Sequence, residues 1–161
     1  MVKCRTLYIT RNLPKTTVIT FPDKGDVRFK SEAESMFARY LQFLKEKREI
    51  PDWQYELEKF DFRQFGYRNK PYEYTPDFRI GNKEDKGYLI EFKVSIKTFD
   101  ISKWIRLKKH YDVILEVALA RIPHKGKGFQ NYARVQDLQR QGRIRRIIDF
   151  SAILKQVKSI I

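Results

Sequence analysis

Two short stretches of the sequence carry acidic and basic side chains at a spacing that could assemble a hydrolytic site. Asp77 stands in Tyr-Thr-Pro-Asp-Phe at 74–78, and Glu91 and Lys93 stand in Ile-Glu-Phe-Lys-Val at 90–94. Aromatic and β-branched residues bounded by turn formers predict a strand in each stretch. Because side chains alternate along a strand, Glu91 and Lys93 share one face. The opposite face is expected to point into a core with the apolar residues Ile90, Phe92 and Val94.

A loop of turn-forming and charged residues at 81–87 joins the two stretches, which predicts a hairpin with Asp77 beside Glu91. Two carboxylates can hold a hard divalent cation such as Mg²⁺ through oxygen, with sites left for water and a phosphate. Such a metal acidifies its water and neutralises charge in the transition state. Lys93 would orient the attacking water or lower its pKa. The alternative is a solvated strand face on which these three residues form cross-strand ion pairs.

A third carboxylate, Glu34, lies at the start of a predicted helix. Apolar residues recur at helical spacing from Ala33 to Leu44, and Ser31 before them is a good N-cap residue. Glu34 follows Ser31 by three positions and so completes a capping box. The competing interpretation is that Glu34 reaches the metal site as a third ligand. A capping role predicts that Gln substitutes well, whereas a ligand role predicts loss of activity.

The composition of the 161 residues favours one globular domain that binds a polyanion. Hydrophobic content is 42%, and the formal net charge is +14. This charge predicts salt-dependent attraction to nucleic acid, and no basic amphipathic helix points to a membrane surface instead. No apolar run approaches the roughly 20 residues that span a bilayer. A single cysteine, Cys4, and two histidines exclude a disulfide framework and a Cys/His zinc site. With no apolar signal segment, we expect a reducing, intracellular and cytoplasmic location.

The remaining pattern predicts a mixed sheet flanked by helices. An apolar run at 113–119 predicts a central strand buried on both faces. A helix that Thr98 or Asp100 can cap, and that ends near Tyr111, precedes this run, which favours a right-handed crossover and parallel pairing. Further elements are expected as follows: extended pieces at 7–9 and 18–21, a strand at 53–57, a helix at 130–141 ended by Gly142, a strand at 143–150 and a helix at 152–157.

Basic residues gather in the C-terminal part of the chain and predict a DNA-binding surface. From 121 to 146, eight Lys and Arg residues stand against one acid, Asp137. Lys-Gly-Lys-Gly at 125–128 is expected to be a loop that lets ammonium and backbone groups approach phosphates. Aromatic and basic residues alternate at 65–72, which fits a nucleic-acid contact loop, a linker crossing between subunits, or a surface loop with half-buried tyrosines. Candidate DNA contacts are Lys103, Lys108, Lys125, Lys127 and Arg134.

Three motifs together resemble the PD-(D/E)xK nuclease superfamily, and most of all the phage endonuclease I family of Holliday-junction resolvases. They are Phe-Lys-Ser-x-x-Glu at 29–34, Thr-Pro-Asp-Phe at 75–78 and Glu-x-Lys at 91–93. The resemblance implies a restriction-endonuclease-like α/β fold, with a mixed central β-sheet flanked by helices. It divides the chain into an N-terminal arm or hairpin at 1–28 and a nuclease domain at 29–161.

The resemblance also implies chemistry and partners. Glu34, Asp77 and Glu91 would hold Mg²⁺, for which Mn²⁺ substitutes, and Lys93 would be the catalytic lysine. The substrate would be branched DNA, such as a four-way junction in DNA recombination, cut symmetrically by a homodimer intertwined through 66–72. A phage-encoded member would work in the host-cell cytoplasm. This chain departs from the family in a longer hairpin between the two carboxylate motifs and in an N-terminal segment without a counterpart.

Other functions are compatible with the same residues. The motifs also resemble nicking, transposition-type (TnsA-like) and restriction-type DNA endonucleases, which keep the active site and change the substrate. A basic nucleic-acid-binding module without catalysis would use the acidic residues only as structural groups. Carboxylates that no cation neutralises repel DNA, however, so three of them in so basic a chain favour a bound metal.

Overall fold

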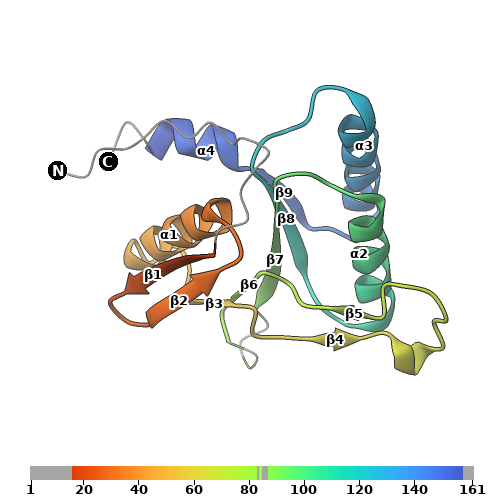
Figure 1. Cartoon of the computed structure of the whole chain (residues 1–161), viewed down its shortest axis with the longest axis horizontal. Coiled ribbons are helices and arrows are strands. Elements are labelled where there is room, and N and C mark those ends of the chain that lie inside the picture. The colour runs from red at the N-terminus through yellow and green to blue at the C-terminus, as the bar shows by residue number, and fades with distance from the viewer. Residues whose placement is uncertain (1–15, 83, 85–86, 158–161) are drawn as a thin grey trace.

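The computed structural model describes residues 16–82, 84 and 87–157, and its centre is a five-stranded mixed sheet (Figure 1). The strands lie in the order β3-β6-β7-β8-β9. Pairing is antiparallel from β3 to β7 and parallel from β7 to β9. The strand bounds are Trp53–Tyr55 for β3, Phe78–Ile80 for β6, Tyr88–Lys93 for β7, Leu115–Leu119 for β8 and Arg146–Asp149 for β9. The predicted α/β class and mixed sheet are confirmed.

Helices cover both faces of this sheet (Figure 1). On one face lie the hairpin of β1 (Thr17–Phe21) and β2 (Gly25–Phe29), α1 (Glu32–Glu46) and α4 (Phe150–Val157). On the other lie α2 (Thr98–His110) and α3 (Gly126–Arg140). A short ribbon of β4 (Phe60–Asp61) and β5 (Glu73–Tyr74), with the 3-10 turn Arg63–Phe65 between them, flanks α2. Within the described ranges, no helix is both long and apolar enough to cross a membrane.

The alternation of side chains along β7 builds one core on each face of the sheet. Ile90 and Phe92 pack in a core with Phe37 of α1. Leu89 packs in a second core with Trp104 of α2. Burial of each such side chain contributes roughly 1.5–3 kcal/mol, so the two cores hold the strand from both sides. Since every residue of β8 is buried, the predicted central strand with two covered faces is confirmed.

The two parallel pairings follow from the order of elements along the chain. A helix lies between β7 and β8, and another lies between β8 and β9. Parallel neighbours need such a crossover, because a tight turn can join only antiparallel strands. The crossover at α2 therefore agrees with the sequence pattern. All three strands consequently end at the same edge of the sheet, where α2 and α3 begin.

Several local expectations were wrong. The residue that caps α2 is Lys97, not Thr98 or Asp100, because the Asp100 carboxylate lies in the first turn and accepts from the Lys97 amide at 2.9 Å. Val94 is 42% exposed, since β7 ends one residue before it. The last strand begins at Arg146 rather than 143.

The basic 125–128 segment and the N-terminal hairpin also differ from expectation. Helix α3 begins at Gly126, so 126–128 form its first turn instead of a phosphate-approaching loop. The predicted extended piece at 18–21 is confirmed as part of β1, which pairs with β2, a strand that the sequence pattern did not reveal. The piece expected at 7–9 lies outside the described residues.

Candidate active site

Asp77 sits where the ladder between β6 and β7 stops. Phe78 is paired with Ile90, so Pro76 falls opposite Phe92, and proline has no N–H to continue the ladder. The Phe92 amide instead donates to Oδ2 of Asp77 at 2.8 Å. This bond and the buried position of Asp77 hold its carboxylate at the strand end, directly across from Glu91. The hairpin and the pairing of these two carboxylates are therefore as predicted.

Glu91 is almost completely enclosed, with 2% of its surface exposed. Its Oε2 accepts a hydrogen bond from the Tyr74 hydroxyl at 2.8 Å, and its Oε1 lies 2.7 Å from Nζ of Lys93. Burial and the charge of Glu91 raise the pKa of Tyr74 well above its usual value, so this hydroxyl remains a donor. One neutral donor and one cation thus orient this buried carboxylate and satisfy both of its oxygens.

Lys93 lies between two carboxylates. Besides Glu91, its Nζ is 3.3 Å from Oδ1 of Asp100, and the same oxygen is 3.2 Å from Nζ of Lys103. Burial alone would lower the pKa of the Lys93 ammonium, but the charges of Glu91 and Asp100 outweigh burial and raise this pKa above its usual value. Lys93 is therefore a permanent cation that donates hydrogen bonds. It is not a proton acceptor in this state.

The Asp77 carboxyl is electrostatically unfavourable in its ionised form. Burial raises its pKa well above the usual range, and the negative charge of Glu91 raises it further. Lys93 opposes this rise, while the charge of Glu34 adds to it. The site thus holds more negative charge than its lysine compensates. A bound cation would relieve this excess.

Glu34 approaches the same site from α1. Ser31 caps this helix, as predicted, because its hydroxyl accepts from the Glu34 amide at 3.1 Å. The Glu34 carboxylate does not return to the Ser31 amide. Its Oε2 accepts from the Tyr55 hydroxyl at 2.7 Å and from the Lys30 amide at 3.2 Å. Tyr55 of β3 therefore turns this carboxylate toward the strands and away from a capping box.

A lysine and a glutamate form an ion pair beside the site, on the side of α1. Lys30 is ion-paired with Glu56, and its ammonium also feels the charges of Asp77 and Glu34, which help to raise its pKa. Glu56 has left-handed backbone geometry (φ 47°), which non-glycine residues seldom adopt. Its amide donates to the Asp77 carbonyl at 2.9 Å, so the unusual backbone is tied to the site.

The groups that orient the site were not found from the sequence. Three side chains each contact a predicted site residue: Tyr74 donates a hydrogen bond to Glu91, Tyr55 donates one to Glu34, and Asp100 forms an ion pair with Lys93. Tyr74 and Tyr55 are distant in sequence from their partners, and Asp100 belongs to the helix that follows Lys93. Asp100 carried a weak signal, because it stands near a predicted helix start. Its position in the first turn, facing Lys93, depends on how α2 packs on the sheet.

Of the five predicted DNA contacts, Arg134 is exposed on α3, and the other four divide into two groups. Lys103 belongs to the active-site end of α2, and its ammonium also lies 5.2 Å from the centre of the Tyr74 ring. Lys125 and Lys127 are exposed at the start of α3, at the same edge of the sheet. Lys108 lies at the far end of α2 and donates to the Val113 carbonyl at 3.2 Å, so the structure does not bring it to the site.

The donor set suits a hard divalent cation. Mg²⁺ is usually held by one or two carboxylates with several waters, and the paired Asp77 and Glu91 offer such oxygens. In the part of the chain that the structure describes, no three metal-ligating side chains converge closely enough to hold an ion directly. Asp77 and Glu91 thus fit as ligands, and the charge of Glu34 also reaches Asp77. Comparisons of the chain with models of protein families, with curated proteins and with solved structures find no match.

Proposed function

We propose that this protein is a metal-dependent DNA endonuclease that hydrolyses phosphodiester bonds, with a restriction-endonuclease-like fold and a PD-(D/E)xK active site. One observation carries the proposal: Asp77 and Glu91 lie side by side on paired strands, with Lys93 hydrogen-bonded to Glu91. A structural ion pair would balance its charges, whereas burial raises the pKa of Asp77 and the negative charges of Glu91 and Glu34 raise it further, against the opposing charge of Lys93. Excess carboxylate charge on a chain of net charge +14 suits a cation-assisted reaction on a polyanion.

Asp77 and Glu91 would hold Mg²⁺, for which Mn²⁺ can substitute, and Glu34 would bind a metal-coordinated water. The metal would acidify water and neutralise charge that develops on the phosphate. Tyr74 and the Phe92 amide keep the two carboxylates in position before substrate arrives. Lys93 would donate a hydrogen bond to the attacking water. When Glu91 binds the metal, Asp100 would hold the Lys93 ammonium in place, because the Asp100 carboxylate already lies 3.3 Å from Nζ of Lys93.

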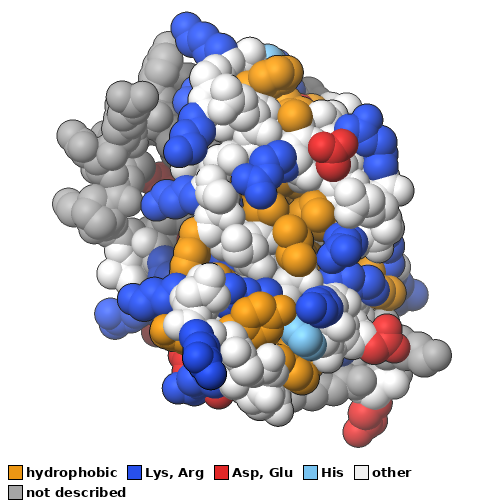
Figure 2. Space-filling model, turned by 90° about the vertical axis from the view of Figure 1, so that its right-hand side faces the viewer, with side chains coloured by type: hydrophobic (Ala, Val, Ile, Leu, Met, Phe, Trp, Pro, Cys, Tyr) orange, Lys and Arg blue, Asp and Glu red, His pale blue; other side chains and the backbone are white. Residues whose placement is uncertain are grey.

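Branched DNA, and a four-way junction in particular, is the substrate that we propose. Resolving a junction requires two nicks related by two-fold symmetry, which a homodimer supplies with one active site per subunit. The basic surface over α2 and α3, seen in Figure 2, is broad enough to contact more DNA than one scissile phosphate needs. A nicking, transposition-type or restriction-type endonuclease would use the same site on other DNA.

The test is cleavage of a labelled four-way junction beside a matched linear duplex, in Mg²⁺, with the wild type and Lys93→Ala. We expect paired cuts in the junction, and a loss of about 10²-fold or more in the variant, because a positioned donor at the reacting water is removed. Lys155→Ala, an exposed lysine on α4, is the matched control and should cut normally.

Each outcome separates the candidates. Equal cutting of both substrates would support the nuclease and overturn the junction preference. Tight binding without cutting in either Mg²⁺ or Mn²⁺ would overturn catalysis and favour the nucleic-acid-binding module. Cutting that survives Lys93→Ala unchanged would mean that another group positions the water.

A further inference from the structure

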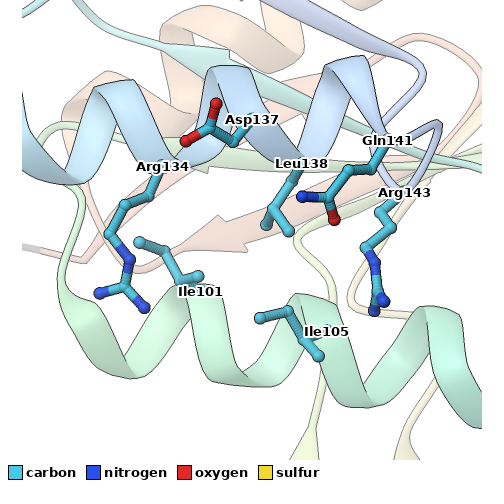
Figure 3. Close-up of a pocket in the computed structure, with 7 residues that line it drawn as sticks. All are labelled: Ile101, Ile105, Arg134, Asp137, Leu138, Gln141 and Arg143. Atoms are coloured by element: carbon cyan, nitrogen blue, oxygen red, sulfur yellow. The ribbon is translucent and has the colours of Figure 1, made fainter.

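We infer that the groove between α2 and α3 is a second DNA contact, which holds a stretch of duplex backbone leading away from the cut site. The groove is lined by apolar residues of both helices and by two arginines, Arg134 and Arg143. Figure 3 shows the two guanidinium groups at opposite ends of the groove, with Ile101 and Ile105 of α2 between them. The identification of the ligand as DNA rests on the proposed function. The position and charge of the groove do not.

The charge of the molecule is concentrated on this side. Residues 97–146 contain thirteen Lys and Arg against four Asp and Glu, a surplus of nine out of the chain's +14. Figure 2, which faces α2 and α3, shows Lys and Arg side chains spread across the surface and few acidic ones. Long-range attraction therefore directs a polyanion to this face.

The four acidic residues are already counted in this surplus, and three of them are buried or ion-paired. Asp100 and Glu116 are buried, and Glu116 is neutralised by Arg145 and Arg146 at 2.6 and 2.9 Å. Asp137, which lines the groove, is paired with Arg140. Asp112 is exposed.

Arg134 and Arg143 have their guanidinium groups available for a ligand. Within residues 16–82, 84 and 87–157, neither side chain forms an ion pair or hydrogen bond. A guanidinium can bind two phosphate oxygens with parallel hydrogen bonds, so arginine suits phosphate better than a point charge does. The charge and the hydrogen-bonding geometry of these two side chains therefore match a nucleic-acid backbone.

The groove is connected to the active site by its position on α2. Ile101, at the Arg134 end, directly follows Asp100, whose carboxylate contacts Lys93. At the other end, a neighbouring pocket shares Arg143 and adds Lys108 and Arg145. The 13 residues of α2 span about 20 Å, which is the rise of about six base pairs. A duplex arm along this line would contact the protein about six base pairs beyond the scissile phosphate.

The test is binding without metal, so that it does not depend on cleavage. Affinity for a four-way junction is measured by fluorescence anisotropy over a series of NaCl concentrations, for the wild type and for Arg134→Ala/Arg143→Ala. We expect the slope of log K against log[NaCl] to fall by about two, because each lost phosphate contact removes about 0.9. The matched control is Arg28→Ala/Arg39→Ala, two exposed arginines elsewhere on the molecule, and its slope should change by less than one. Thermal melting checks that both variants fold.

Arm length gives a second, independent readout. Lengthening the junction arms from 4 to 12 base pairs should raise wild-type affinity at least fivefold and should raise that of the groove variant less than twofold. Equal slopes for the groove and control variants, or equal gains with arm length, would overturn the inference. Competition by polyglutamate as strong as that by DNA of equal charge would also overturn it, because the groove would then bind any polyanion. If the wild type never cuts DNA but the groove substitutions still weaken DNA binding, the inference about the groove is supported and the proposed nuclease activity is rejected.

Discussion

Asp77 is the residue at which the chemistry of the site can be tested without a substrate. Its carboxyl is buried beside Glu91, and its pKa is raised well above the ordinary 3.8. The folded protein therefore holds a proton at pH values where the unfolded chain has released it. The free energy of unfolding consequently falls as the pH rises above about 4, and the fall continues until the pH passes the raised pKa. A carboxylate that lowers stability in this way is typical of a functional position.

We predict that Asp77→Asn stabilises the metal-free protein at pH 7. Asn can still accept from the Phe92 amide, whereas the unfavourable charge disappears. A gain of about 1 kcal/mol would raise Tm by about 2–4 °C in a domain of this size. The gain should shrink toward pH 4. Mg²⁺ should raise the Tm of the wild type and leave that of the variant unchanged, because only the wild type keeps both ligands.

Thermal melting at several pH values, with and without Mg²⁺, provides the measurement. Asp112→Asn is the control, since it removes a carboxylate that is exposed on the surface. An equal response of both variants to pH and to Mg²⁺ would show that Asp77 is an ordinary structural aspartate.

At the scale of elements, the start of α1 assigns helix capping and a place at the site to two different residues, whereas the sequence allows Glu34 either role. Ser31 caps the helix, and Glu34 is bonded to Tyr55 and to the Lys30 amide. The cap acts on the stability of the helix. The Glu34 carboxylate acts at the strand edge, where its charge reaches Asp77. Substitutions at the two positions should therefore have different consequences.

We predict that Glu34→Gln retains stability and loses activity. The Gln carbonyl can accept both hydrogen bonds, so the free energy of unfolding should change by less than about 0.5 kcal/mol. Removing a charge that helps to orient the metal should lower the affinity for Mg²⁺ and the rate of cleavage, each by about 10- to 100-fold. Ser31→Ala should show the reverse pattern, with about 1 kcal/mol of stability lost and cleavage retained at saturating Mg²⁺. Denaturant unfolding and cleavage rates over an Mg²⁺ series measure both. A capping role for Glu34 would appear as lost stability with normal cleavage.

At the scale of the whole molecule, the segment before the hairpin of β6 and β7 bears on assembly. In the single chain, the Arg106 guanidinium of α2 donates to the Asn69 carbonyl at 2.9 Å and to the Pro71 carbonyl, and it stacks on the Tyr67 ring. These contacts hold residues 67–71 against α2. An intertwined dimer would make the same contacts with the partner's α2, since exchange of identical elements between subunits conserves them.

We predict that the protein sediments as a dimer at micromolar concentration, with twice the chain mass of 19.5 kDa. Two active sites related by two-fold symmetry are needed for paired cuts, and sedimentation equilibrium measures the mass directly. A monomer under these conditions would contradict the resolvase proposal. In a Cys4→Ser background, a bis-maleimide cross-linker that joins Asn69→Cys to Arg106→Cys then distinguishes the arrangements. A cross-link between chains indicates exchange of the segment, and a cross-link within one chain indicates that each subunit keeps its own.

The sequence by itself determined the local units of this protein. Alternation in 90–94 put Glu91 and Lys93 on one face, and the turn-rich loop before it implied the hairpin that pairs Asp77 with Glu91. The buried strand β8 and the Ser31 cap were also readable, because periodicity, turn residues and caps act over a few neighbouring positions.

Only the tertiary structure decided which side chains support the site. Tyr74 and Asp100 reach Glu91 and Lys93 because β5 and α2 pack on one face of the sheet, and Tyr55 reaches Glu34 because β3 pairs with β6. Likewise, the basic 125–128 segment could have been a loop, and it became the first turn of α3 instead. Such partners are set by the packing of two separate cores, which joins residues far apart in sequence. No local pattern encodes those distances.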